Sequence, residues 1–276
     1  MNKKDKKSNL LIYFLLFICL IFIYAYYIEP FNLCINEYKI EDKNIPDSFD
    51  SLKIIHFSDL HYGSSVNIEY VKKVVKLINK QEPDIVFFTG DLLDKRANMN
   101  KKNIEVFKNE INKIESTLGN FAVSGNHDYE NIKAFKAVLK DNFTLLNNKE
   151  SLIYYKKNIP ISIIGFDDSS EGKPNYDILK NETQYFRFIL IHEPDEFDNI
   201  KDYNFNIMLS GHSHNGQVRI PLIGKIYTPN GAKKYYDEYY NLNNKELFIS
   251  NGIGTSMLNI RFMSQPSINL YRIYAH

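Results

Sequence analysis

The strongest constraint in the sequence is an unbroken run of uncharged, mostly apolar residues at positions 10–28. A helix that crosses the hydrocarbon core of a bilayer needs about 20 such residues. The run is apolar on every side, whereas a helix that packs on the core of a soluble protein keeps a polar face. We therefore predict a transmembrane anchor over residues 10–28, preceded by a basic tail over residues 1–9.

The orientation of this segment follows from its flanks. A cleavable signal peptide would have a shorter apolar core and small residues before the cut, and residues 24–27, Tyr-Ala-Tyr-Tyr, lack that pattern. Lysines at positions 3, 4, 6 and 7 precede the run, and the positive-inside rule keeps them in the cytoplasm. We expect a single-pass protein of the cell membrane with a cytoplasmic N-terminus and an extracytoplasmic domain. The alternative is that the anchor holds the domain on the cytoplasmic face of the membrane.

The remaining composition is that of an ordinary globular protein. The net charge of +1 provides no basic face, so no long nucleic acid is expected as a partner. The two cysteines, Cys19 and Cys34, are too few for a disulfide framework. We expect one domain over residues 52–276, joined to the anchor by a mostly polar linker over residues 29–51.

The first half of this domain alternates short apolar runs with helical patterns. This alternation predicts an α/β fold with parallel strands. The expected strands are residues 52–57, 84–89 and 120–123, and the expected helices are residues 68–79, 104–118 and 132–139.

The second half contains strand-like runs with few helices between them, so a second or mixed sheet should follow the first. The expected strands are residues 151–155, 161–166, 186–191, 207–209, 217–220, 247–250 and 268–273.

Polar residues gather where five of these runs end. In open α/β sheets, ligands bind beyond the carboxyl ends of the strands, where loops from distant parts of the chain meet. A lone histidine at such a place is more often structural, but the pattern occurs five times. The residues are Asp59 and His61, Asp91 and Asp94, Asn126 and His127, His192, and His212 and His214.

The local spacing supports a shared ligand. In an extended segment, residues two apart point to the same side, so Asp59 and His61 could reach one cation, as could His212 and His214. Glycines beside these residues permit sharp turns and close approach. His56 lies inside a strand-like run, and we expect it to be a core histidine.

As a set, these motifs resemble the calcineurin-like metallophosphoesterases. The resemblance covers residues 52–273, with all motif blocks in the family's order. It implies a four-layer αββα sandwich, two mixed sheets flanked by helices. The family often has Glu after the motif histidine, where Asp128 stands here, and we expect little consequence.

The resemblance also implies two divalent metal ions and a role for each site residue. Asp91 would bridge the two ions. His127 would be the catalytic acid or hydrogen-bond donor, oriented by Asp94. The first ion would be held by Asp59, His61, Asp91 and His214, and the second by Asp91, Asn126, His192 and His212. Histidine nitrogens favour transition metals, so Mn, Fe or Zn is expected.

The implied reaction is hydrolysis of a phosphate ester or pyrophosphate bond by a metal-bridging hydroxide. The substrate would be a phosphorylated small molecule or a lipid. Residues 211–218 look like a membrane-linked subgroup that includes phosphoesterases of UDP-2,3-diacylglucosamine-type lipids. The loop at 227–240, rich in tyrosine and lysine, either touches an anionic lipid surface or merely closes a sheet. The alternatives are a nucleotide phosphodiesterase and a non-catalytic scaffold.

Overall fold

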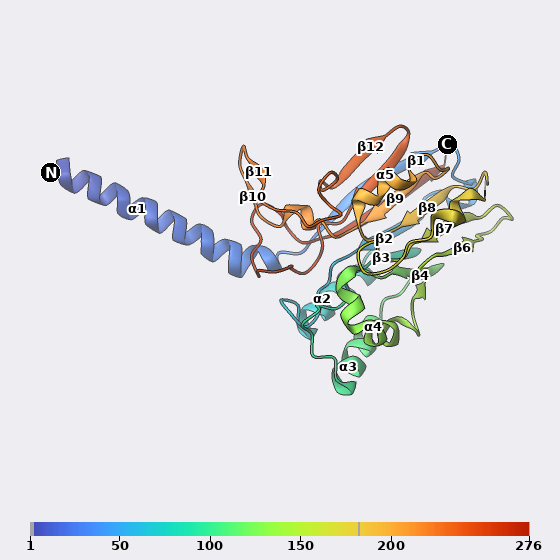
Figure 1. The fold of residues 1–276 in the computed structure, drawn as a ribbon, viewed down its shortest axis with the longest axis horizontal. Coiled ribbons are helices and arrows are strands. Elements are labelled where there is room, and N and C mark those ends of the chain that lie inside the picture. The colour runs from blue at the N-terminus through green and yellow to red at the C-terminus, as the bar shows by residue number, and fades with distance from the viewer. Residues whose placement is uncertain (1–2, 182, 276) are drawn as a thin grey trace.

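The structure is a computed structural model that describes residues 3–181 and 183–275. Its first sheet has six strands in the order β1-β14-β2-β3-β4-β5 (Figure 1). The strands from β2 to β5 are parallel, as the alternation of strands and helices predicts. The bounds are β1 (Cys34–Asp42), β14 (Ser267–Ala275), β2 (Lys53–Phe57), β3 (Ile85–Thr89), β4 (Gly119–Val123) and β5 (Thr144–Leu145).

Three helices connect these strands and cover one face of the sheet: α2 (Ile68–Asn79), α3 (Lys101–Ile111) and α4 (Ile132–Leu139). The side chain of Asn67 begins α2 by accepting a hydrogen bond from the backbone N–H of Tyr70 at 3.0 Å. Asn100 does the same for α3, which therefore begins before the predicted residue 104. α3 also ends earlier than the predicted residue 118.

The second sheet also has six strands, in the order β12-β13-β9-β8-β7-β6. Its four central strands are parallel and its two edge strands are antiparallel. A short helix, α5 (Phe197–Ile200), lies on its outer face. The bounds are β6 (Lys149–Ile153), β7 (Ile161–Gly165), β8 (Arg187–Leu190), β9 (Ile207–Ser210), β12 (Tyr239–Leu242) and β13 (Lys245–Ile249).

Three apolar layers separate the four layers of secondary structure. Phe107 and Phe135 pack between the helices and the first sheet. Phe87 and Phe188 meet between the two sheets with ring centroids 5.5 Å apart. Phe197 belongs to the third cluster, outside the second sheet. The four-layer αββα sandwich is therefore confirmed.

The segment for which the sequence predicts a linker contains a strand. β1 pairs in parallel with β14 over its whole length, so part of residues 29–51 lies within the first sheet. β1 is an edge strand and much of it stays accessible, with only Ile40 fully buried. An edge strand of this kind keeps polar side chains, which removes the apolar pattern by which a strand is predicted.

One more strand pair stands outside both sheets. β10 (Arg219–Ile220) pairs with β11 (Gly224–Lys225) as an isolated antiparallel hairpin. The sequence predicts a longer strand over residues 217–220. Gln217 instead has a φ of 50°, which interrupts any extended backbone there.

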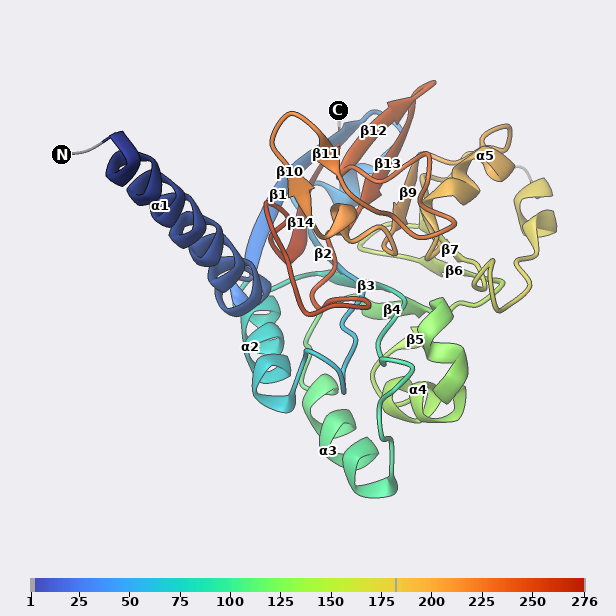
Figure 2. The ribbon, with the colours of Figure 1, turned by 60° about the vertical axis from the view of Figure 1, so that its left-hand side comes forward.

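The apolar run near the N-terminus forms a long helix, α1 (Lys3–Ile23), which continues as a π-helical turn (Tyr24–Ile28) and a 3₁₀ turn (Glu29–Phe31). In the described part of the chain it is the one helix long and apolar enough to cross a membrane. Figures 1 and 2 show α1 standing clear of the body. Residues 3–9 of the predicted basic tail belong to α1, and residues 1–2 lie outside the described residues.

The end of this helical segment is packed into the domain. Ala25, Glu29 and Pro30 are buried. Ala25 accepts a hydrogen bond from the backbone N–H of Arg261 at 2.9 Å, and the carboxylate of Glu29 accepts one from the N–H of Ser264 at 2.6 Å. These contacts join the end of the apolar helix directly to the domain.

His56 lies in the core, as its position in a strand predicts. It is fully buried, and its ring nitrogens lie 3.2 Å from the hydroxyl of Tyr271 and 2.8 Å from that of Thr89. Burial lowers its pKa to about 3. The neutral ring is therefore a structural part of the first sheet.

This burial predicts how stability depends on pH. The unfolded chain takes up a proton on His56 below a pH of about 6.5, whereas the folded chain does not. The free energy of unfolding should therefore fall by up to about 1.4 kcal/mol for each pH unit below that value. His56→Gln should remove this part of the slope. Denaturant unfolding of both chains in detergent micelles measures it, and equal slopes would contradict the assignment.

Candidate metal centre

The nine polar residues singled out in the sequence come together at one edge of the molecule. They follow the carboxyl ends of β2, β3 and β4 in the first sheet and of β8 and β9 in the second. Because the two sheets pack face to face, their loops meet at this edge. The site is thus built from both sheets.

The backbone of the site differs from the predicted extended geometry. Asp59 and His61 have φ values of 53° and 49°, and His212 and His214 have 65° and 49°. These values lie in the left-handed region, which Asp and His enter more readily than most residues. The chain must turn sharply at the end of each strand, and the side chains converge through these turns rather than through strand periodicity.

Glycines let two of these turns approach other loops closely. A Cβ at Gly125 would lie 2.4 Å from the Oδ1 of Asp91. A Cβ at Gly211 would lie 2.0 Å from the Oγ of Ser58. No side chain larger than hydrogen fits at either position without moving the polar residues beside it.

A first cluster contains Asp59, His61 and His214, each of which offers one atom within 4.8 Å of the others. The Nε2 atoms of His61 and His214 are 3.2 Å apart. The Nε2 of His214 is 3.4 Å from the Oδ1 of Asp59. The Oδ2 of Asp91 lies 3.6 Å from the Nε2 of His61.

A second cluster contains Asp91, His192 and His212. The same Oδ2 of Asp91 is 3.3 Å from the Nε2 of His192, which lies 3.1 Å from the Nδ1 of His212. The Oδ1 of Asn126 is buried without a hydrogen-bond partner. Asp91 belongs to the second cluster and also forms a third group of donor atoms with His61 and His127, so it links the two clusters.

The donor atoms fit a cation. The Nδ1 of His192 donates to the carbonyl of Thr89 at 2.7 Å, and the Nε2 of His212 donates to that of Asn230 at 2.7 Å. In the neutral rings, the opposite nitrogens therefore present lone pairs to each other. Two nitrogens bound to one metal at about 2.1 Å lie roughly 3 Å apart. Carbonyl contacts of this kind orient the ligands of known metal sites.

Burial sets the charge of these rings. It lowers the pKa of His61 to about 3 and that of His212 to about 4, so both are neutral at pH 7, as metal binding requires. Burial also acts on His192, but the adjacent carboxylate of Asp91 outweighs it and raises the pKa well above its ordinary value. A proton on the Nε2 of His192 lies between that nitrogen and the Oδ2 of Asp91, where a bound cation would lie.

Asp94 lies between two histidines. Its Oδ2 is 3.9 Å from the Nδ1 of His127 and 3.8 Å from the Nδ1 of His61. Burial alone would raise the pKa of Asp94, but hydrogen bonds from Arg96 at 2.8 and 3.2 Å hold it below its ordinary value. Asp94 thus remains charged and lies near both rings, but no hydrogen bond joins it to the Nδ1 of His127, so its orienting role stays a prediction.

Asp128, to which the sequence gives little importance, braces the site. Its Oδ2 accepts hydrogen bonds from the N–H groups of Asp91 and Gly125 at 2.9 and 3.0 Å, and its Oδ1 accepts one from Leu93 at 3.0 Å. Asp128 occupies the third position of a short 3₁₀ helix that follows Gly125. An acidic residue at that position is a capping signal and could have revealed this role.

Arg261 carries no sequence signal and is also structural. It is fully buried, and its Nη2 donates to the carbonyl of Asn251 at 2.8 Å. The same nitrogen lies 3.3 Å from the Nδ1 of His214. Ser264 donates its hydroxyl to the carbonyl of His214 at 3.0 Å. The loop that binds the end of the apolar helical segment therefore also binds His214.

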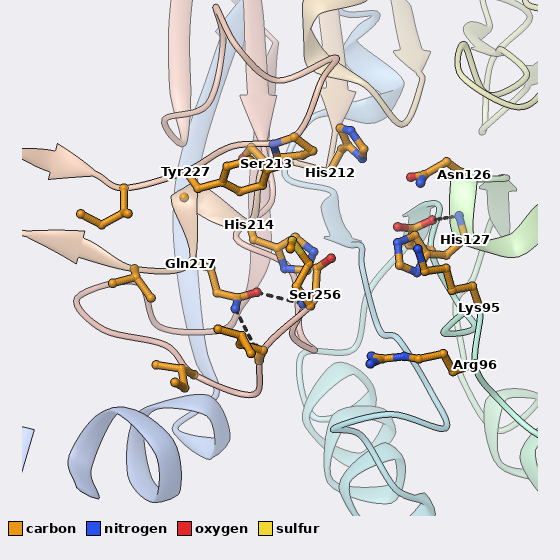
Figure 3. A pocket seen from close by; sticks show the side chains of 18 residues that line it. Lys95, Arg96, Asn126, His127, His212, Ser213, His214, Gln217, Tyr227 and Ser256 are labelled. Atoms are coloured by element: carbon orange, nitrogen blue, oxygen red, sulfur yellow. Dashed lines mark hydrogen bonds between the residues drawn. The ribbon is translucent and has the colours of Figure 1, made fainter. Parts of the chain in front are cut away.

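A cavity of about 480 Å³ lies over the clusters. Figure 3 shows Lys95, Arg96 and His127 on one side of it and Gln217 and Tyr227 on the other. Apolar side chains also form part of its lining, namely Val218, Ile226, Met257, Leu258 and Ile260. The cavity joins a polar floor to an apolar wall.

Much of the tyrosine-rich loop at residues 227–240 makes contacts within the domain. Tyr235 is buried and donates its hydroxyl to Asp198 at 3.1 Å, and Lys234 pairs with Asp198 at 2.6 Å. The hydroxyl of Tyr240 accepts two backbone hydrogen bonds from the same loop. These contacts favour the sheet-closing alternative for this part of residues 227–240.

The matching family model, calcineurin-like phosphoesterase, covers residues 52–216, and the chain belongs to this family. It is a metallophosphoesterase, a phosphoester hydrolase whose His and Asp clusters can bind metal ions. The uncharacterized metallophosphoesterase YkuE of Bacillus subtilis is 30% identical over 91% of this chain and 88% of its own length.

Two further similarities extend the comparison. UDP-2,3-diacylglucosamine pyrophosphatase LpxG of Chlamydia trachomatis is 27% identical over 92% of this chain and 93% of its own length. Among solved structures, TT1561 of Thermus thermophilus aligns with 73% of this chain and 90% of its own, at a TM-score of 0.47 and 14% identity.

The close approach at Gly125 gives a test of the site. Gly125→Ala would push a methyl group into Asp91, and we expect the affinity for Mn²⁺ to fall by at least about tenfold, as when ligand supports are removed. Titration calorimetry on the full chain in micelles measures this affinity. Gly224→Ala is the control: its Cβ would meet nothing within 4 Å, although its φ of 86° strains an alanine there, so it shows what backbone strain outside the clusters does to the affinity. Unchanged affinity in Gly125→Ala would show that Asp91 does not bind the metal.

Proposed function

We propose that the protein is a binuclear metal-dependent phosphoesterase that hydrolyses a phosphate ester or pyrophosphate bond. The observation that carries the proposal is the position of one carboxylate oxygen of Asp91, 3.6 Å from His61 and 3.3 Å from His192. A carboxylate placed between two imidazole clusters suits a pair of cations. A single structural metal would need only one of the clusters.

The proposed ligand sets are those implied by the family resemblance. Imidazole nitrogens mixed with carboxylate oxygens suit Mn²⁺, Fe or Zn²⁺ better than Ca²⁺. Asp91 belongs to both sets. The first set is Asp59, His61, Asp91 and His214, and the second is Asp91, Asn126, His192 and His212.

When bound, two such cations neutralise the phosphate oxygens and acidify a water molecule for in-line attack. His127 lines the cavity beside the clusters and would donate a proton or hydrogen bond to the reacting oxygen. Asp94 would hold its ring and stabilise its protonated form. Lys95 and Arg96, on the same side of the cavity, would attract the anionic substrate.

We favour a lipid-linked substrate over a free nucleotide. The apolar wall of the cavity and the anchor at its side support this choice, and one similar protein is named a UDP-2,3-diacylglucosamine pyrophosphatase. A nucleotide phosphodiesterase is the second candidate; a 26% identical protein of Escherichia coli is named phosphodiesterase YaeI, a name that states no substrate. A scaffold without activity would have no need for two adjoining clusters beside a cavity.

The catalytic assignment is tested with the full chain in detergent micelles, stripped of metal by a chelator. Turnover of bis-(p-nitrophenyl) phosphate should return with Mn²⁺. Asp91→Asn should abolish it together with metal binding. His127→Ala should lower turnover by about 10²–10⁴ while metal content is retained. Metal loss in His127→Ala, or full activity in Asp91→Asn, would contradict the proposed roles.

We also propose that α1 crosses the cell membrane with its N-terminus in the cytoplasm and the domain outside. The lysines before the apolar run support this orientation. In a Cys19→Ser, Cys34→Ser chain, a cysteine introduced by Ile159→Cys should react with an impermeant maleimide on intact cells, since Ile159 is 55% exposed. Labelling only after lysis would establish the opposite orientation.

A further inference from the structure

Exposed apolar side chains gather at the mouth of the cavity. They come from two segments that are tied together, because Arg219 donates its N–H to the carbonyl of Phe262 at 2.9 Å and Gln217 donates its amide to that of Leu258 at 2.8 Å. We call this surface the apolar rim. It consists of Ile220, Leu222, Ile223, Ile226, Tyr227, Met257, Leu258 and Met263.

The exposure of the rim is large for apolar residues. Leu222 is 108% exposed, Ile223 73% and Met257 72%. Ile226, Tyr227, Met257 and Leu258 also line the cavity, so the rim and the cavity wall are one continuous apolar surface. A contiguous exposed apolar surface of this kind marks an interaction site.

The backbone conformation of the rim indicates that the exposure of its apolar residues has a function. Leu222, Met257 and Met263 have φ values of 70°, 59° and 54°. Leucine and methionine rarely adopt this left-handed conformation, and turns that require it usually contain Gly or Asn. An exposed leucine in this conformation destabilises the folded chain, and no burial within the domain offsets that cost. Strain of this kind is typical of functional segments.

The rim is joined to the root of the anchor. Its second segment carries Arg261, whose N–H donates to Ala25 at the end of the long helix. The following Ser264 binds the carboxylate of Glu29. In both ribbon views the β10–β11 hairpin rises from the body on the side from which α1 departs (Figures 1 and 2). A bilayer crossed by α1 would therefore lie against the rim.

Basic side chains stand beside the apolar ones. The Nζ of Lys225 lies over the ring of Tyr236 at 3.0 Å from its centroid, and that of Lys233 lies over Tyr227 at 4.8 Å. Inside the cavity, Lys95 adds positive charge. Apolar residues flanked by lysine suit the interface of a membrane with anionic headgroups. A soluble protein partner would have no reason to lie at the root of an anchor.

We propose that the apolar rim inserts into the bilayer that α1 crosses, so that the cavity opens onto the membrane surface. A phosphorylated headgroup then enters the cavity laterally while its acyl chains stay in the bilayer along the rim. This inference rests on the proposed function for the substrate class. Insertion itself depends only on the rim and the anchor.

The absence of tryptophan from the sequence makes insertion measurable. Tyr227→Trp places a single tryptophan in the rim, and Ile159→Trp places one in the β6–β7 connection as the control. The full chains are reconstituted, without added metal, in phosphatidylcholine–phosphatidylglycerol vesicles that contain brominated phosphatidylcholine. We expect quenching of Tyr227→Trp at least about fivefold stronger than that of Ile159→Trp, because bromine quenches only rings within the lipid.

A second variant tests the rim rather than the reporter. Leu222→Asn with Ile223→Asn, added to Tyr227→Trp, should abolish most of the quenching, since Asn suits the left-handed turn but not the lipid. Equal quenching of Tyr227→Trp and Ile159→Trp, or quenching that survives both asparagines, would overturn the proposal. Because fluorescence needs no turnover, an inactive but inserted protein would contradict only the proposed function.

Discussion

The structure depends on the burial of charge at the meeting point of the two sheets. The carboxylates of Asp59, Asp91 and Asp94 are all at most 2% exposed, and isolated buried carboxylates cost several kcal/mol each after relaxation. Arg96 pairs with Asp94, but Asp59 and Asp91 face mainly imidazole rings and backbone N–H groups. Cations between them can balance these charges, which explains why so many donor atoms converge and why glycines and left-handed turns bring them close.

The site residues could be predicted because of topology. Parallel strands place their carboxyl ends at a common edge, so residues as distant as Asp59 and His214 meet without any local signal that they should. The conformation of the motifs could not be predicted in the same way. The two-residue spacing of Asp59 and His61, and of His212 and His214, suggested extended segments. The chain instead turns sharply after each strand, and these four residues adopt left-handed backbone conformations.

The supporting residues were hidden for a different reason. Asp128 and Arg261 act on backbone groups and a ring from distant parts of the chain, which come near only after folding. Arg96 lies only two residues from its partner Asp94, but no motif in the sequence marks it. β1 was hidden because an exposed edge strand needs no apolar alternation. The strands that are buried on both faces, such as β3 and β7, were found with small errors at their ends because continuous apolar runs reveal them.

The position of β14 has a consequence for biosynthesis. This strand, at residues 267–275, lies between β1 and β2 in the first sheet. While the ribosome is still adding those residues, the sheet has a gap between its first two strands, and the edge of β2 is unpaired. The domain cannot reach its final sheet during elongation, and an incomplete chain keeps an open strand edge that invites association with other chains. The first sheet is therefore completed only after residues 267–275 have been synthesised, although α1 and β1 are made long before.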